Sequence, residues 1–265
     1  MGDTRGATSG PRVAVVTEAT TALGRAISLA LARAGYAVLG SGRTPRVGEL
    51  VMRRIRDQGG DAVFLSTDPD CEDATAAFVA EAAARHGRLD VAVNNAGAAL
   101  DEGRLADVRT EAVEQMFRLN VLTVFWAMKY QIRQMLAQDP AGGVILNLAT
   151  AAGVDGVRFS AGYSATRHAV VGLTRSAALE YAVDGIRVLG FVPASTQHAP
   201  LAGAPAAWAR NNPQITGFRP ADRREWLDGT AAAIVRLAAP EAAFITETVV
   251  RVDGGHGPAT PPPSP

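Results

Sequence analysis

The stretch RVAVVTEATTALGRAISLALARAGYAVLGSG, residues 12–42, decides the fold. It opens with a short β-branched run at 12–17, continues with Ala and Leu at helical spacing over 21–35, and ends with a second apolar run at 36–42. Gly35 stands where a helix commonly stops. Two short apolar runs joined by a helix predict a strand–helix–strand unit with parallel strands.

The same alternation continues along the chain. Further strands are predicted at 61–67, 89–97, 142–150, 185–193 and 247–255, and further helices at 46–59, 71–86, 109–137, 160–183 and 222–239. Strands that read as continuous apolar runs are typical of parallel sheets covered on both faces. We therefore expect one doubly wound Rossmann-type α/β domain over residues 12–256, with a mostly parallel seven-stranded sheet and helices on both faces.

Three segments lie outside this alternation. Residues 1–11 are small, polar and Gly-rich, and we expect a flexible arm. Residues 257–265 read GPATPPPSP, and this Pro content predicts an extended tail. Residues 194–219 combine Pro, Gly and Asn with apolar residues such as Trp208. This loop predicts contact with an apolar or aromatic substrate, with plain packing onto the core as the alternative.

The composition excludes several classes of partner. The 265 residues include 26 Lys+Arg and 26 Asp+Glu, a formal net charge of +0, which gives no electrostatic reason to expect nucleic acid or an anionic membrane. The single cysteine, Cys71, excludes an intrachain disulfide and fits the cytoplasm. The first residues contain no apolar run, so no signal peptide is expected, and no stretch approaches 18 uncharged apolar residues, so no membrane span is expected. No metal site is predicted.

Polar residues gather where the first two predicted strands end. Ligands bind at the carboxyl ends of the strands in sheets of this kind. Thr20, Thr21 and Gly24 open the first helix, whose free N–H groups favour a phosphate, although a single glycine also fits an ordinary capped turn. After the second strand stands Arg43, whose guanidinium can bind a ribose 2′-phosphate or simply lie in solvent.

A second set of residues follows the fourth and fifth predicted strands. The string Asn94-Asn95-Ala96-Gly97 suits a tight turn with buried amides. Tyr163 and Arg167, four residues apart on a predicted helix, share one face. A positive charge beside a phenol favours the phenolate, which makes Tyr163 a candidate acid–base for a carbonyl/alcohol pair, with Thr150 placed to bond the substrate oxygen. The alternative is a surface Tyr–Arg stack.

Taken together, five strings resemble the short-chain dehydrogenase/reductase family over nearly the whole chain, from Arg12 to Gly255. They are VNNAG at 93–97, RLNVLT at 118–123, ILNLAT at 145–150, YSATR at 163–167 and RVDGG at 251–255. Their order and spacing match the family's pattern. The resemblance implies an oxidoreductase that transfers hydride between NADP(H) and a small carbonyl or alcohol, and that assembles as a homo-oligomer, a dimer or tetramer.

The resemblance also implies roles for single residues. Asn120 matches the Asn that supports a proton-relay water, and Thr150 falls at the position of a Ser. Tyr163 is the acid–base, and Arg167 stands where the family has the Lys that holds the nicotinamide ribose. The implied NADP(H)-binding residues are Thr17, Thr20, Thr21, Leu23, Gly24, Arg43, Thr44, Asp68, Asn94, Ala96, Gly97, Tyr163, Arg167, Pro193 and Thr196.

Three positions depart from the family's pattern and bear on its activity. Glu18 and Ala22 replace two of the three glycines in the phosphate turn. A carboxylate about 4 Å from a phosphate costs on the order of 4 kcal/mol at an effective dielectric near 20, unless Glu18 points to solvent or pairs with Arg25 or Arg43. Arg167 keeps the charge of the Lys but does not give up a proton.

Three functions stay open on these grounds. The first is the NADP-dependent ketoreductase or alcohol dehydrogenase. The second is a catalytically impaired relative that serves as a binding or partner subunit. The third is a non-redox enzyme, such as a dehydratase, cyclase or isomerase, that reuses the pocket with Tyr163 as acid–base.

Overall fold

The computed structural model describes residues 10–193, 220–245 and 247–252. The expected arm lies almost wholly outside this range, and the loop at 194–219 with Thr196 and the tail at 257–265 lie entirely outside it.

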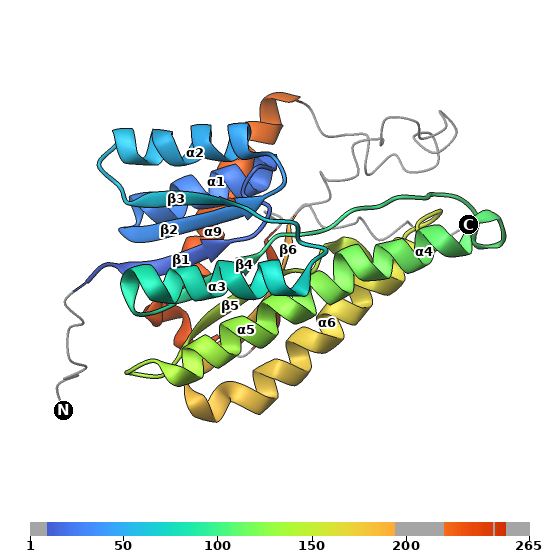
Figure 1. Cartoon of the computed structure of the whole chain (residues 1–265). Coiled ribbons are helices and arrows are strands. Elements are labelled where there is room, and N and C mark those ends of the chain that lie inside the picture. Colours follow the sequence, from blue (N-terminus) through green and yellow to red (C-terminus); the bar gives the residue numbers. More distant parts are fainter. Residues whose placement is uncertain (1–9, 194–219, 246, 253–265) are drawn as a thin grey trace.

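A seven-stranded sheet forms the centre of the molecule, and all its strands are parallel (Figure 1). Its order is β3-β2-β1-β4-β5-β6-β7, so the direction of winding reverses between β1 and β4. The strands are β1 (Arg12–Val16), β2 (Tyr36–Gly42), β3 (Ala62–Ser66), β4 (Val91–Asn94), β5 (Gly143–Leu148), β6 (Ile186–Pro193) and β7 (Val249–Val252). The predicted doubly wound α/β fold is thereby confirmed.

Helices cover both faces of the sheet (Figure 1). One face carries α1 (Ala22–Arg33), α2 (Pro45–Asp57) and α9 (Pro220–Ala238); the other carries α3 (Glu72–His86), α5 (Thr123–Ala137) and α6 (Ala161–Tyr181). Alternation along β1 explains the two layers. Ala14 and Val16 pack with the first set of helices, whereas Val13 and Val15 pack with the second, because successive strand residues face opposite sides.

The helix predicted over 109–137 is interrupted. The chain forms α4 (Thr110–Phe117), a π-helical segment η2 (Arg118–Leu122), and then α5. The buried positions Ala112, Met116, Asn120 and Val124 keep a four-residue spacing through all three segments, so the spacing alone did not reveal the break. Such π segments are rare and often mark functional sites, and Asn120 stands in this one.

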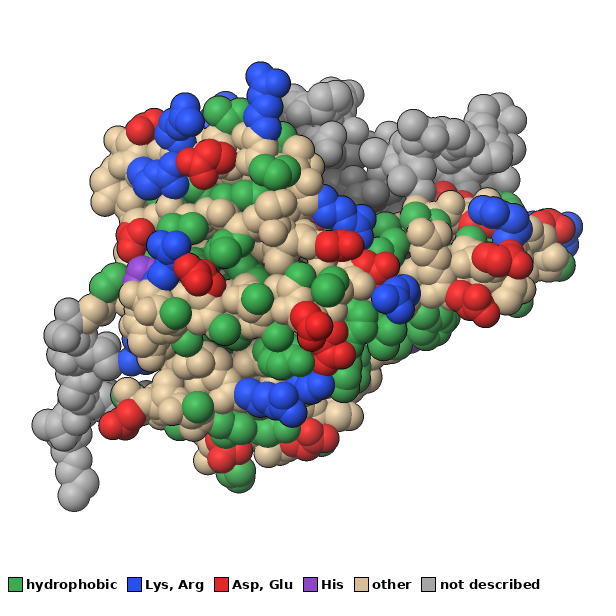
Figure 2. Space-filling view, viewed as in Figure 1, with side chains coloured by type: hydrophobic (Ala, Val, Ile, Leu, Met, Phe, Trp, Pro, Cys, Tyr) green, Lys and Arg blue, Asp and Glu red, His purple; other side chains and the backbone are tan. Residues whose placement is uncertain are grey.

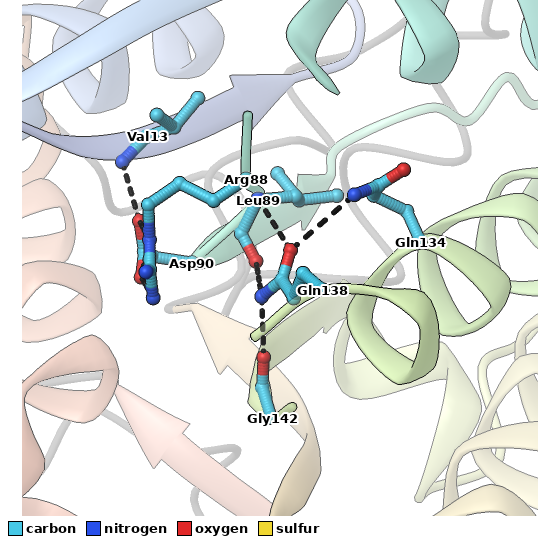
Figure 3. Close-up of polar contacts among 7 residues, drawn as sticks. All are labelled: Val13, Arg88, Leu89, Asp90, Gln134, Gln138 and Gly142. Carbon is cyan, nitrogen blue, oxygen red and sulfur yellow. Dashed lines mark hydrogen bonds and ion pairs between the residues drawn. The ribbon is translucent and has the colours of Figure 1, made fainter. Parts of the chain in front are cut away.

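Polar side chains tie together the amino ends of the central strands (Figure 3). Asp90 accepts a hydrogen bond from the Val13 amide at 2.7 Å and pairs with Arg88 at 2.6 Å. Gln138 accepts from the Leu89 amide at 2.8 Å and donates to two carbonyl oxygens of neighbouring loops. These bonds satisfy backbone groups at the end of the sheet opposite the candidate site.

Candidate active site

The candidate site lies at the carboxyl ends of β1, β4, β5 and β6, beside the reversal of winding. Open parallel sheets leave a crevice there, since neighbouring loops diverge to opposite faces. The β1–α1 turn, the loop after β4 and the first turns of α6 meet at this edge.

The β1–α1 turn keeps the backbone shape of a glycine-rich turn, although only one of the three expected glycines, Gly24, is present. Glu18 has φ +50°, in the left-handed region that favours glycine. Its carbonyl oxygen accepts bonds from the Thr21 amide at 3.1 Å and the Thr21 hydroxyl at 3.0 Å. A Cβ on Gly24 would overlap this same oxygen, so the one remaining glycine is required by close approach.

The N-terminus of α1 is capped from within the turn. Thr21 is the N-cap, and its hydroxyl accepts from the Gly24 amide at 3.0 Å, as expected for a Thr at this position. The side chain of Leu23 is buried in the core beneath α1. Ala22 lines a groove formed by α1, α2 and α9. The free donors of this helix end are therefore backbone N–H groups of the turn.

The carboxylate of Glu18 is half-buried beside a charged pair. Burial raises the pKa of Glu18, the positive charge of Arg43 opposes that rise, and Asp68 adds to it. Arg43 itself pairs with Asp68, at 3.4 Å between Nε and Oδ1. Within the described residues, the pairing of Glu18 with Arg25 or Arg43 that we considered from the sequence is not formed as an ion pair. Thus two carboxylates compete for one guanidinium just after the end of β2.

Replacing Glu18 by Gln is expected to stabilise the protein at neutral pH. When the pKa of a carboxyl group is higher in the folded than in the unfolded state, its contribution to the free energy of unfolding is fully present below the unfolded-state pKa. That stabilisation is lost as pH rises through the folded-state pKa. Glu18→Gln keeps the backbone and removes the buried charge. Thermal unfolding at pH 7 should give a Tm higher by about 1–3 °C, and the difference should vanish near pH 4, about the ordinary pKa of Glu. An equal difference at both values would contradict this origin.

The loop after β4 is fastened to the β1–α1 turn by Asn95. Its amide N–H donates to the Thr17 hydroxyl at 3.0 Å, and its side-chain nitrogen donates to the Thr21 hydroxyl at 2.9 Å. Its side-chain oxygen is buried without a hydrogen-bond partner among the described residues. Our sequence reasoning did not assign Asn95 to the site, although it stands within the Asn-Asn-Ala-Gly string.

Asn94 points into the protein. Its side-chain nitrogen donates to Gln131 at 3.0 Å and to Asn147 at 2.8 Å, and its oxygen accepts from Gln131 at 2.8 Å. This fully buried amide network joins β4, β5 and α5. Asn147 stands within the string ILNLAT, whereas Gln131 carries no motif signal of its own, and both meet Asn94 only in the fold.

Asn120 is fully buried, and both ends of its amide are occupied. The oxygen accepts from the Ala98 amide at 2.7 Å, and the nitrogen donates to the Ala98 carbonyl at 2.8 Å and to Thr166 at 3.0 Å. Asn120 therefore joins the loop after β4 to α6. Asn120 stands in the π-helical segment η2, and its side chain reaches the loop after β4.

Thr150 is strained and its hydroxyl is unsatisfied. Its φ of +55° is rare for a β-branched residue, and its Oγ1 is buried without a hydrogen-bond partner in the described part of the chain. Strain of this kind, on the order of 1–3 kcal/mol, persists mainly at functional sites. A buried hydroxyl without a partner has the hydrogen-bonding capacity to meet a ligand oxygen.

Tyr163 and Arg167 share one face of α6, as their spacing predicted. The guanidinium carbon lies 5.0 Å from the centroid of the Tyr163 ring. Both side chains are buried, so the alternative of a surface Tyr–Arg stack is wrong. The arrangement sets a fixed positive charge beside the phenol.

The guanidinium of Arg167 is held by the loop after β4. It donates to the Ala96 carbonyl at 3.1 and 3.2 Å and to the Leu148 carbonyl at 3.3 Å, while its Nε has no partner among the described residues. A Cβ on Gly97 would overlap the guanidinium, which packs flat on that glycine. Within residues 10–193, 220–245 and 247–252, no carboxylate pairs with Arg167, and its acceptors there are the carbonyl oxygens of Ala96 and Leu148.

The remaining predicted residues lie around this centre or outside the described range. Thr17 and Asp68 follow β1 and β3, Thr44 precedes α2, and Pro193 ends β6 as a buried residue. The structure brings the residues following β1, β4 and β5 together with those of α6. Thr196 lies in the segment that the structure does not describe.

Comparisons with known proteins agree with this geometry. Residues 12–208 match the family model described as short chain dehydrogenase. The chain is 31% identical over 263 residues to a 3beta-hydroxysteroid dehydrogenase of Mediterraneibacter gnavus, covering 92% of this chain and 94% of the relative. It is 35% identical over 245 residues to a cis-4-hydroxycyclohexanecarboxylate dehydrogenase of Sinomonas cyclohexanicum, covering 92% and 96%. An actinorhodin polyketide ketoreductase variant solved with NADPH superposes with a TM-score of 0.78 at 29% identity, covering 93% and 97%.

Proposed function

Because this chain belongs to the short chain dehydrogenase family, we propose that it transfers hydride between NADP(H) and a carbonyl/alcohol substrate, with Tyr163 as acid–base. The observation that carries the proposal is the buried pair of Tyr163 and Arg167 at the carboxyl edge of the sheet. The unsatisfied hydroxyl of Thr150 supports it.

Apart from Glu18, whose half-buried carboxylate forms no ion pair among the described residues, the residues present fit a nicotinamide cofactor. The β1–α1 turn offers backbone N–H groups at a helix N-terminus for the pyrophosphate, and Gly24 keeps the close approach that the turn needs. The side-chain nitrogen of Asn95 bonds this turn, and its side-chain oxygen, which has no partner among the described residues, could accept from a ribose hydroxyl. When bound, NADPH supplies the hydride that the substrate carbonyl carbon accepts.

The side chains of the protein would supply one proton to the substrate oxygen. In reduction, the Tyr163 hydroxyl donates its proton to the substrate oxygen as that oxygen gains negative charge. The guanidinium of Arg167 then lies beside the ring that carries the negative charge, 5.0 Å from its centroid. Because a guanidinium does not release its proton, Arg167 acts as a fixed charge, and the proton returns to Tyr163 from solvent. The Thr150 hydroxyl holds the substrate oxygen in place.

The preferred cofactor is proposed to be NADP(H), with Arg43 as the ligand of the 2′-phosphate. Its present partner, Asp68, is exposed and 3.4 Å away, so the pair contributes little and a phosphate dianion can displace it. Thr44, next in the chain, adds a hydroxyl at the N-cap of α2.

Titration with NADPH and NADH tests both the cofactor and its preference. Wild-type protein should bind NADPH at micromolar Kd and NADH more weakly. Arg43→Gln should weaken NADPH binding about 10- to 100-fold and leave NADH nearly unchanged, because only the phosphate contact is lost. Asp68→Asn should tighten NADPH binding by removing a competing carboxylate. Failure of the wild type to bind either cofactor up to about 1 mM would overturn the proposed function.

The substrate is proposed to be a secondary alcohol on an apolar ring, or the corresponding ketone. The two relatives described above are named for hydroxyl groups on a steroid and on a cyclohexane ring. The segment 194–219, which carries Trp208, is the part of the sequence expected to meet such a ring. Cyclic ketones and alcohols are therefore the first set to screen.

We also propose that the chain forms a homo-oligomer and acts in the cytoplasm. Hydrophobic side chains are exposed along α4 and α5, among them Phe117 and Phe125 at 39% and 46% (Figure 2). Exposed apolar surface of this kind commonly marks an interface. Cys71 is an exposed free thiol, which a reducing compartment keeps reduced. No helix in the described part of the chain has both the length and the apolar character to cross a bilayer.

A further inference from the structure

A groove runs between α1, α2 and α9, on the face of the sheet opposite α5 and α6. These three helices lie side by side on that face (Figure 1). The groove has a volume of about 1290 Å³. Its floor is apolar, with alanines such as Ala26 and Ala30 from α1, Leu50 from α2 and Val235 from α9. None of the candidate catalytic residues lines it.

Arginines surround this apolar floor. The lining includes Arg25 and Arg33 from α1, Arg54 from α2, and Arg224 and Arg236 from α9. All five side chains are exposed. Asp228 is the only carboxylate among the described lining residues, and it lies 3.9 Å from Arg224.

The other four arginines form no ion pair within the part of the chain that the structure describes. In a protein with a formal net charge of +0, this leaves a local excess of positive charge over an apolar concavity. A ligand that complements this groove carries negative charge and has one apolar side.

Other occupants fit these features less well. Residues 1–9, 194–219 and 253–265 contain only Asp3 and Asp253 as acidic residues, so no segment outside the description complements the charge. A second copy docked by two-fold symmetry would face arginine with arginine. A flat membrane does not enter a groove, and a polyanion without an apolar side leaves the floor uncovered.

We propose that this groove binds an amphipathic helix of a partner protein, with Asp and Glu flanking its apolar stripe. Such a helix is about 10 Å across, and three turns of it are about 16 Å long. Small alanines let its backbone approach α1 closely, and the arginines pair with the acidic flanks. Helix-in-groove docking is a common mode of recognition. The proposal does not depend on the proposed enzymatic function.

A labelled synthetic peptide tests the proposal on the full-length protein by fluorescence anisotropy. The probe is a helix of about 15 residues with Leu and Ile on one face and Glu on both flanks; its control replaces every Glu by Gln. Wild-type protein should bind the Glu peptide at micromolar Kd, more weakly as salt rises. Arg33→Gln/Arg54→Gln should weaken binding about tenfold or more. Arg53→Gln, an exposed neighbour that does not line the groove, should leave it unchanged.

A second variant tests the apolar floor. Leu50 is 55% exposed, so Leu50→Asp should fold normally and yet lose peptide binding. Three results would overturn the proposal: equal binding of the two peptides, equal effects of Arg53→Gln and Arg33→Gln/Arg54→Gln, or no binding up to about 1 mM. Two further results would also overturn it. One is self-association of the protein that Arg33→Gln/Arg54→Gln abolishes, and the other is binding to vesicles containing phosphatidylserine without any binding to the peptide.

Discussion

Tyr163→Phe should lower kcat/KM for ketone reduction by about 10²–10⁴-fold, the usual contribution of a positioned acid–base group. The phenol of Tyr163 is buried beside the permanent positive charge of Arg167. Among the described residues at this edge of the sheet, no other tyrosine hydroxyl lies beside a positively charged side chain. Phenylalanine keeps the ring and its packing against Arg167 and removes only the hydroxyl. Steady-state kinetics with NADPH and a cyclic ketone measures the loss.

Binding must be separated from chemistry in this experiment. The Kd of NADPH should change by less than about threefold in Tyr163→Phe, since the proposed loss falls on the transition state. Tyr181→Phe is the matched control, because Tyr181 lies at the far end of the same helix and packs against the core. Full activity in Tyr163→Phe would exclude the proposed mechanism. Loss of an activity that needs no cofactor would instead favour the non-redox alternative.

Gly97→Ala should destabilise the fold by about 3–5 kcal/mol, the range seen when a buried charge loses its partners. The added methyl group would occupy the place of the Arg167 guanidinium, which would have to leave the carbonyls of Ala96 and Leu148. A fully buried positive charge would then have no counterpart. Urea denaturation of the variant measures the effect.

A double-mutant cycle identifies Arg167 as the cause. In an Arg167→Met background, Gly97→Ala should cost much less than in the wild type, giving a coupling of about 2 kcal/mol. Gly172→Ala is the matched control: nothing lies within 4 Å of the added Cβ, so the change should be neutral or stabilise α6 by up to about 1 kcal/mol. The same cost of Gly97→Ala in both backgrounds would show that the guanidinium is not what Gly97 accommodates.

These two predictions divide the role of Arg167 into two parts. In the proposed mechanism its charge lies beside Tyr163, whereas its hydrogen bonds fasten the loop after β4 to α6. From the resemblance, we expected Arg167 to hold the nicotinamide ribose. In the structure its two terminal nitrogens donate to backbone carbonyls, and its Nε remains as the unsatisfied donor. Binding of the ribose therefore remains a prediction that rests on Nε.

The sequence by itself determined the order of strands and helices and the edge at which the site lies. Apolar runs alternating with helical patterns fix this architecture because strands and helices have different periods, which any local stretch displays. The capping role of Thr21 and the shared face of Tyr163 and Arg167 were predictable for the same reason, since both depend on residues at most four positions apart.

Only the tertiary structure decided how those residues are used. The inward amide network of Asn94, the unsatisfied hydroxyl of Thr150 and the competition of Glu18 and Asp68 for Arg43 all join residues far apart along the chain. The break of the predicted helix at Asn120 was hidden because the buried positions keep a four-residue spacing through the π segment. Local propensity specifies elements, but hydrogen-bond partners, burial and charge depend on which loops the fold brings together.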